Sequence, residues 1–136
     1  MTSNEENDDR TDPRVLVVDD DGDIVRIVRF VLREMGITRI ESASDGDQAL
    51  ALLTKGHDHF DLIICDWVMP TLSGLDVLIG IRAMNARVPF LMLTAKVSPE
   101  AIAAAKKAGV TSYIAKPFTP IELKKKIRFL IDKIPT

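Results

Sequence analysis

The chain has 136 residues, of which 46% are hydrophobic and 28% charged, with a net charge of −2 and a single cysteine, Cys65. These values predict one compact domain whose core needs neither disulfides nor a structural metal. The longest uninterrupted apolar runs, 49–53 and 101–105, have five residues each, whereas roughly 20 are needed to cross a bilayer. We therefore expect no membrane insertion. A lone thiol and a first segment unlike a secretory signal favour a cytoplasmic location.

Charge is unevenly distributed along the chain. Residues 1–12 contain five acidic residues and one arginine, which leaves 17 basic and 15 acidic residues from Pro13 onward. We expect residues 1–12 to form a disordered acidic tail and residues 13–136 to form the folded domain. The weak positive charge of that domain gives no case for binding nucleic acid.

Short apolar runs alternate with amphipathic stretches along the folded part. The expected strands are 15–18, 39–43, 60–65, 89–93 and 111–115. The expected helices are 24–35, 47–55, 74–84 and 99–108, followed by a last helix with an apolar stripe at Leu123, Ile127, Leu130, Ile131 and Ile134. Five such strand-helix units with right-handed crossovers predict an α/β, flavodoxin-like doubly wound (βα)5 fold. Its parallel five-stranded sheet would have the order 2-1-3-4-5.

Local signals mark several element ends. Gly36 and Gly109 follow two of the expected helices, where a residue with positive φ commonly ends a helix. Asp23 is a candidate cap for the first helix. Cys65 is expected to be a small buried hydrophobic residue, and Trp67 to be partly exposed.

Polar residues follow four of the expected strands. Asp19 and Asp20 come after the first strand, Asp66 after the third, Thr94 after the fourth and Lys116 after the fifth. The carboxyl ends of parallel strands form the ligand-binding edge in such sheets, and neighbouring strand ends lie about 5 Å apart. Three carboxylates this close predict either raised pKa values or a bound hard cation, for which Mg²⁺ is the expected ion.

Four segments carry a closer resemblance. They are 15–20 (VLVVDD), 61–75 (DLIICDWVMPTLSGL), 90–96 (FLMLTAK) and 113–118 (YIAKPF). Together they closely resemble the receiver domains of two-component response regulators, and the resemblance covers about residues 13–134. All five signature positions of that family are present in order.

The resemblance implies a role for each matching residue. Asp66 would be the phosphoacceptor, and Mg²⁺ would be held by Asp20, Asp66 and the backbone carbonyl of Val68, with Asp19 orienting its water shell. Lys116 would pair with the acceptor carboxylate and then with the phosphoryl group. Thr94 would bond a phosphoryl oxygen, and Tyr113 would be the rotamer switch. The resemblance also implies a cis Lys116-Pro117 bond, which X-Pro sequences adopt at low cost.

Because no second domain follows the last expected helix in the sequence, we expect a single-domain signalling protein rather than an enzyme with its own substrate. The resemblance implies that it catalyses only its own Mg²⁺-dependent phosphorylation and dephosphorylation. The donor would be a histidine kinase or a histidine phosphotransfer protein. Output would be either a phosphorelay or docking on a downstream protein through the helix 99–108, the strand 111–115 and the last helix, as in chemotaxis regulators. We expect a monomer or a weak dimer.

Other classes fit the sequence less well. The phosphate-binding motif G-x-x-x-x-G-K-[ST] is absent, which argues against a P-loop nucleotide site. A haloacid-dehalogenase phosphatase needs a second aspartate two residues after its nucleophile, where this chain has Val68. The serious alternative is a receiver-like scaffold that binds partners without being phosphorylated. Lysines and arginines on the first and last helices are either solvated faces or docking sites.

Overall fold

The computed structural model describes residues 12–134 except 57–58, 85 and 96. Five strands form one parallel sheet in the order β2-β1-β3-β4-β5. They are β1 (Arg14–Val18), β2 (Arg39–Ala43), β3 (Leu62–Asp66), β4 (Phe90–Thr94) and β5 (Ser112–Ala115). The predicted fold class and strand order are therefore confirmed.

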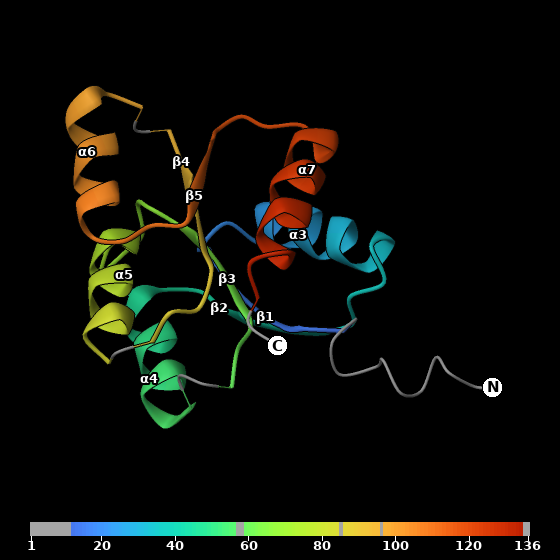
Figure 1. The fold of residues 1–136 in the computed structure, drawn as a ribbon, viewed down its shortest axis with the longest axis horizontal. Coiled ribbons are helices and arrows are strands. Elements are labelled where there is room, and N and C mark those ends of the chain that lie inside the picture. Colours follow the sequence, from blue (N-terminus) through green and yellow to red (C-terminus); the bar gives the residue numbers. More distant parts are fainter. Residues whose placement is uncertain (1–11, 57–58, 85, 96, 135–136) are drawn as a thin grey trace.

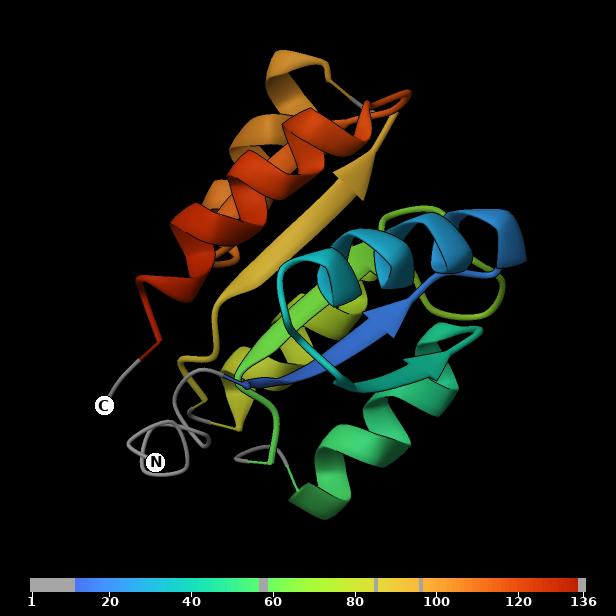
Figure 2. The same ribbon diagram turned by 90° about the vertical axis from the view of Figure 1, so that its right-hand side faces the viewer.

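Helices cover both faces of this sheet (Figures 1 and 2). They are α3 (Gly22–Glu34), α4 (Gly46–Gly56), α5 (Gly74–Ala83), α6 (Pro99–Lys107) and α7 (Pro120–Ile131). Buried residues of α3 and α7 pack into one core cluster, whereas those of α4, α5 and α6 pack into the other. The sheet is thus the middle layer of three, because right-handed crossovers place helices on opposite faces where the strand order reverses at β1. None of the described helices is long and apolar enough to cross a membrane.

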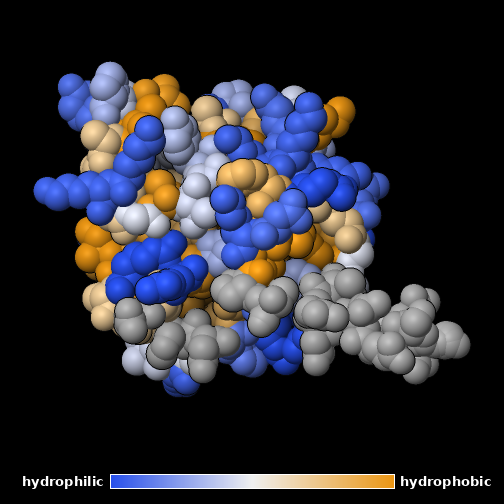
Figure 3. Space-filling view, viewed as in Figure 1, coloured by the Kyte–Doolittle hydropathy of each residue, from blue (hydrophilic) through white to orange (hydrophobic). Residues whose placement is uncertain are grey.

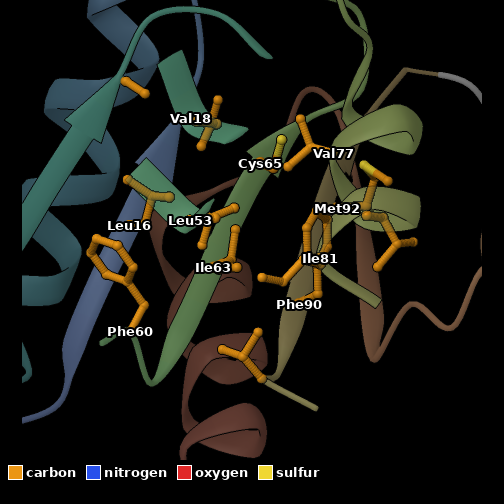
Figure 4. Close-up of a cluster of buried hydrophobic side chains, with 14 of the residues drawn as sticks. Leu16, Val18, Leu53, Phe60, Ile63, Cys65, Val77, Ile81, Phe90 and Met92 are labelled. Carbon is orange, nitrogen blue, oxygen red and sulfur yellow. The ribbon is translucent and has the colours of Figure 1, made fainter. Parts of the chain in front are cut away.

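The core lies where the central strands are covered on both faces. Every residue of β3 and β4 is buried, in agreement with their nearly continuous apolar sequences. Figure 4 shows one of the two clusters, in which Ile63, Cys65, Phe90 and Met92 of these strands meet side chains of the helices. Cys65 is buried as expected, and burial raises the pKa of its thiol well above the usual value.

Polar side chains fix the beginnings of the helices. Asp21, not Asp23, caps α3, because the helix begins at Gly22 and the Asp21 carboxylate accepts a hydrogen bond from the Asp23 backbone N–H. Ser73 caps α5 and Thr119 caps α7, each through a reciprocal capping box that satisfies two backbone donors. The predicted ends at Gly36 and Gly109 have positive φ angles of 84° and 94°.

The predicted boundaries differ from the structure by one or two residues at most elements. The exception is Ile134, which we placed on the stripe of the last helix but which lies beyond the end of α7. At the other end, the Asp12 carboxylate accepts hydrogen bonds from the backbone N–H and the hydroxyl of Thr38, both at 2.9 Å. The expected acidic tail otherwise lies outside the described residues.

Candidate functional site

Three carboxylates converge at the carboxyl edge of the sheet. Asp66 is the last residue of β3. Asp19 extends β1 by one residue, since its N–H donates to the Ala43 carbonyl at 3.1 Å. Because β1 and β3 are neighbours in register, Asp19, Asp20 and Asp66 each offer an oxygen within 4.8 Å of the others. Asp19 and Asp66 are only 2% and 6% exposed, whereas Asp20 faces solvent.

Lys116 approaches this cluster from the end of β5. Its backbone N–H continues the sheet ladder by donating to the Thr94 carbonyl at 2.8 Å. Its Nζ lies 3.1 Å from Asp66 Oδ1 and 3.3 Å from Asp19 Oδ2. Burial alone would lower the pKa of Lys116, but the hydrogen bond to Asp66 and the two carboxylate charges raise it above its usual value. The side chain is therefore a cation that bridges two buried carboxylates.

One lysine does not neutralise three carboxylates. Burial, together with the charge of Asp66, raises the pKa of Asp19 to about 6, although the Asp21 N–H and Lys116 oppose the shift. Such crowding favours either a proton or a second cation. A compact set of carboxylate oxygens fits a hard divalent ion such as Mg²⁺. The donor set thus matches the metal that the sequence predicts.

Thr94 and Tyr113 lie on the neighbouring strands β4 and β5 and connect the carboxylate cluster with the edge of the sheet. Thr94 ends β4 and is 1% exposed. Tyr113 pairs with Met92, and Thr94 pairs with Ala115, in the parallel register of β4 and β5. Because side chains alternate along strands, Met92, Thr94 and Tyr113 share one face of the sheet. Met92 and Tyr113 both pack in the cluster beneath α4, α5 and α6.

The loop that follows Asp66 folds back against the sheet. The Trp67 N–H donates to the Leu93 carbonyl at 2.9 Å, and the Trp67 carbonyl accepts from Gly74 at 2.7 Å. Trp67 is consequently only 8% exposed and joins the core, so our expectation of partial exposure was wrong. Val68, one residue later, is 60% exposed beside the site.

Gly74 is a positioning residue that our sequence reasoning did not single out. A Cβ at this position would lie 2.2 Å from the backbone carbonyl oxygen of Asp66, a separation that no packed atoms tolerate. The start of α5 can therefore approach the carboxylate-bearing strand only because residue 74 lacks a side chain. The available signal was a glycine directly after Ser73, the cap of a helix that begins close to a strand end.

Fold and site together define a doubly wound α/β domain with an acidic, lysine-bridged pocket at the carboxyl ends of its central strands. A family model for the response regulator receiver domain matches residues 15–128, and the chain belongs to that family. Its members are signalling proteins rather than enzymes of the usual kind. Receiver domains bind Mg²⁺ at an acidic pocket and interact with histidine kinases and downstream targets.

Curated relatives and solved structures agree with this assignment. The chain is 41% identical to chemotaxis protein CheY-3 of Vibrio cholerae over 123 residues, which are 89% of this chain and 93% of that protein. Chemotaxis protein CheY of Pseudomonas aeruginosa is 38% identical over 123 residues, 89% of this chain and 98% of that protein. The receiver domain of the Francisella response regulator 1452 is 34% identical. Its structure superposes on this one with a TM-score of 0.81, and the match covers 90% of this chain and 98% of that chain. CheY4 of Vibrio cholerae is 36% identical, with a TM-score of 0.80 over 88% and 99% of the two chains.

Proposed function

We propose that Asp66 accepts a phosphoryl group from a phosphohistidine of a kinase or phosphotransfer protein. The observation that carries this proposal is the contact of 3.1 Å between Lys116 Nζ and the carboxylate of Asp66, inside a cluster with two further aspartates. Phosphoryl transfer depends on positioning and charge neutralisation more than on covalent assistance. A carboxylate nucleophile with an adjacent ammonium supplies both.

The step transfers one phosphoryl group between two partners. A carboxylate oxygen of Asp66 forms a bond to phosphorus while the nitrogen-phosphorus bond of the phosphohistidine breaks. The product is an acyl phosphate on Asp66, and the histidine leaves with the electron pair of the broken bond and takes up a proton. The Lys116 ammonium forms an ionic contact with the carboxylate of Asp66 before the transfer and with the phosphoryl oxygens after it.

We assign the metal to Asp20, Asp66 and the backbone carbonyl of Val68, with Asp19 orienting its water shell. When bound, Mg²⁺ supplies positive charge against the oxygens of the transferring group. The exposure of Asp20 and Val68 supports this assignment, since Mg²⁺ keeps several waters and needs an open side.

Output is assigned to the surface formed by α6, β5 and α7, which we call the α6-β5-α7 surface. Thr94 lies beside the acceptor strand and shares a face of the sheet with Tyr113. A hydrogen bond from the Thr94 hydroxyl to the phosphoryl group would let the Tyr113 ring move inward, and this movement would change the α6-β5-α7 surface. The signal then passes to a downstream protein, as the resemblance to chemotaxis regulators suggests, or along a phosphorelay.

Treatment with acetyl phosphate and Mg²⁺, followed by intact-mass measurement, tests this function. We expect the native protein to gain the mass of one phosphoryl group and the Asp66→Asn variant to gain none. The replacement is nearly isosteric, so circular dichroism should show an unchanged fold. A native protein that gains no mass under these conditions would instead support the scaffold that binds partners without phosphorylation.

A further inference from the structure

A groove with a volume of about 710 Å³ runs along the outer edge of the sheet between β5 and α7. We call it the β5-α7 groove. Tyr113 and Pro117 line one side, while Lys125, Lys126 and Phe129 line the other. β5 is an edge strand of the described sheet, and the Phe129 side chain is half exposed. The groove is therefore open to an occupant that lies along β5.

Positive charge is concentrated beside this groove. Four cations, Lys124, Lys125, Lys126 and Arg128, lie within two turns of α7, and Figure 3 shows hydrophilic side chains over this helix. Among the described residues, none of the four forms an ion pair with a carboxylate. Of the four, only Lys125 and Lys126 line the groove, together with Glu122, whose carboxylate accepts a hydrogen bond of 2.8 Å from the Thr119 N–H. Two lysines against one glutamate give the lining a net charge of +1, and Lys124 and Arg128 add positive charge elsewhere on the same helix. This excess of positive charge favours an anionic occupant.

We propose that this occupant is the acidic segment 5–9 of the same chain, docked in the β5-α7 groove. The segment has the sequence EENDD, which places four carboxylates within five residues. Between Thr2 and Thr11 the chain has no aliphatic or aromatic side chain, so it lacks the apolar anchors that would give a tight or rigid complex. Docking is electrostatic, and the segment exchanges between a bound and a free state.

The position of the anchored end allows this contact. Asp12 is held by Thr38, next to the beginning of β2, so the segment starts at the edge where the parallel strands begin. α7 runs back toward that edge and ends there (Figures 1 and 2). Three strand spacings, about 15 Å in all, separate β1 from β5. The seven residues from Asp12 back to Glu5 span up to about 23 Å when extended, so the Glu5 end of the segment can enter the groove, whereas Asp9 can extend only about 10 Å from Asp12.

Tethering makes a weak contact effective, because a short linker holds its segment at an effective concentration on the order of millimolar. The groove also forms part of the α6-β5-α7 surface. A consequence follows that rests on the proposed function: if that surface is the output site, the docked segment competes there with the downstream partner. The segment would then lower the basal affinity of the unphosphorylated protein for its target.

A spin label placed near the segment tests the docking directly. A nitroxide on the Asn4→Cys variant reports which amides it approaches, and buried Cys65 stays unlabelled. In the full chain without phosphorylation, we expect selective loss of amide signal intensity along Ser112–Ala115 and along residues 122–129. The loss should disappear in about 0.5 M NaCl, where screening shortens the reach of charges to a few ångströms. It should also disappear when segment 5–9 is neutralised by Glu5→Gln, Glu6→Gln, Asp8→Asn and Asp9→Asn.

Matched lysine variants identify the surface. Lys124→Gln, Lys125→Gln and Lys126→Gln together should restore the signals, whereas Lys106→Gln with Lys107→Gln, two exposed neighbouring cations on α6, should not. Broadening that is absent from the groove, that centres on α3, or that survives salt and the α7 variants overturns the proposal. Since neither phosphate nor a partner is present, this outcome is separate from whether Asp66 is phosphorylated.

Discussion

The Lys116 ammonium lies 3.1 Å from the Asp66 carboxylate, a contact between the end of the edge strand β5 and the end of the central strand β3. β4 lies between these two strands. The backbone N–H of Lys116 donates to the Thr94 carbonyl at the end of β4, and from this position the long lysine side chain extends past β4 to Asp66. The same ammonium reaches Asp19, 97 positions away in the sequence. The fold therefore holds its nucleophile candidate against a fixed cation.

Removal of that cation should slow phosphorylation. For Lys116→Gln we expect the rate constant with acetyl phosphate and saturating Mg²⁺ to fall roughly 100-fold or more, the usual effect of losing one preorganised electrostatic group. Intact-mass time courses would measure it. Lys125→Gln, which removes an equal charge from the surface of α7, is the control and should react at the native rate. Equal rates for the native protein and Lys116→Gln would remove Lys116 from the transfer step.

Loss of Asp20 should weaken Mg²⁺ binding. We expect Asp20→Asn to raise the dissociation constant by at least about tenfold, since even residues that only orient metal ligands commonly contribute that much. Buried Trp67 directly follows Asp66, so its fluorescence should report the titration. Asp23→Asn removes an exposed carboxylate outside the cluster and should leave the constant unchanged. An Asp20→Asn protein that binds as tightly as the native one would place the metal elsewhere.

Asp19 should destabilise the metal-free protein at neutral pH. Its pKa rises from 3.8 to about 6 on folding, with burial as the largest cause. The folded state then binds a proton at Asp19 more tightly than the unfolded state, so the contribution of Asp19 to stability is fully present below about pH 4 and is lost as the pH rises through about 6. In EDTA at pH 7, Asp19→Asn should raise the free energy of unfolding by about 1–2 kcal/mol, because the variant does not bury an ionised carboxylate at this position.

Urea unfolding at two pH values measures this effect. The difference between the native protein and Asp19→Asn should be clear at pH 7 and nearly absent at pH 4, where both side chains are neutral. A variant that is less stable than the native protein at pH 7 would show that the contact with Lys116 outweighs the crowding of carboxylates.

Val68 should help to set the lifetime of the phosphoryl group. Hydrolysis needs a water held in line with phosphorus, and a valine cannot hold one. We expect Val68→Asn to accelerate dephosphorylation by up to about tenfold, because one hydrogen bond contributes about 0.5–1.5 kcal/mol. Val68→Ala, which removes apolar bulk without adding an amide, should have little effect. Lys96, the second position that we expect to influence this rate, lies outside the described residues.

The sequence predicted most of the fold because its apolar periods are clear and its strands end on polar residues. The crowding of Asp19, Asp20 and Asp66 followed from the strand order and the spacing of strands. The buried position of Trp67 could not be predicted in the same way, since it depends on the loop folding back onto Gly74 and Leu93. The cap at Asp21 was missed because α3 begins before its first apolar residue.

The identity of the acceptor is the central claim, and borohydride reduction tests it most directly. An acyl phosphate on a carboxylate is reduced to an alcohol, which leaves homoserine at that position and is read by tandem mass spectrometry of the peptide. After treatment with acetyl phosphate and Mg²⁺, we predict homoserine in place of Asp66 and unreduced side chains at Asp19 and Asp20. Reduction at either of those aspartates, or phosphate found as an ester on Thr94 or Ser73, would contradict the assignment.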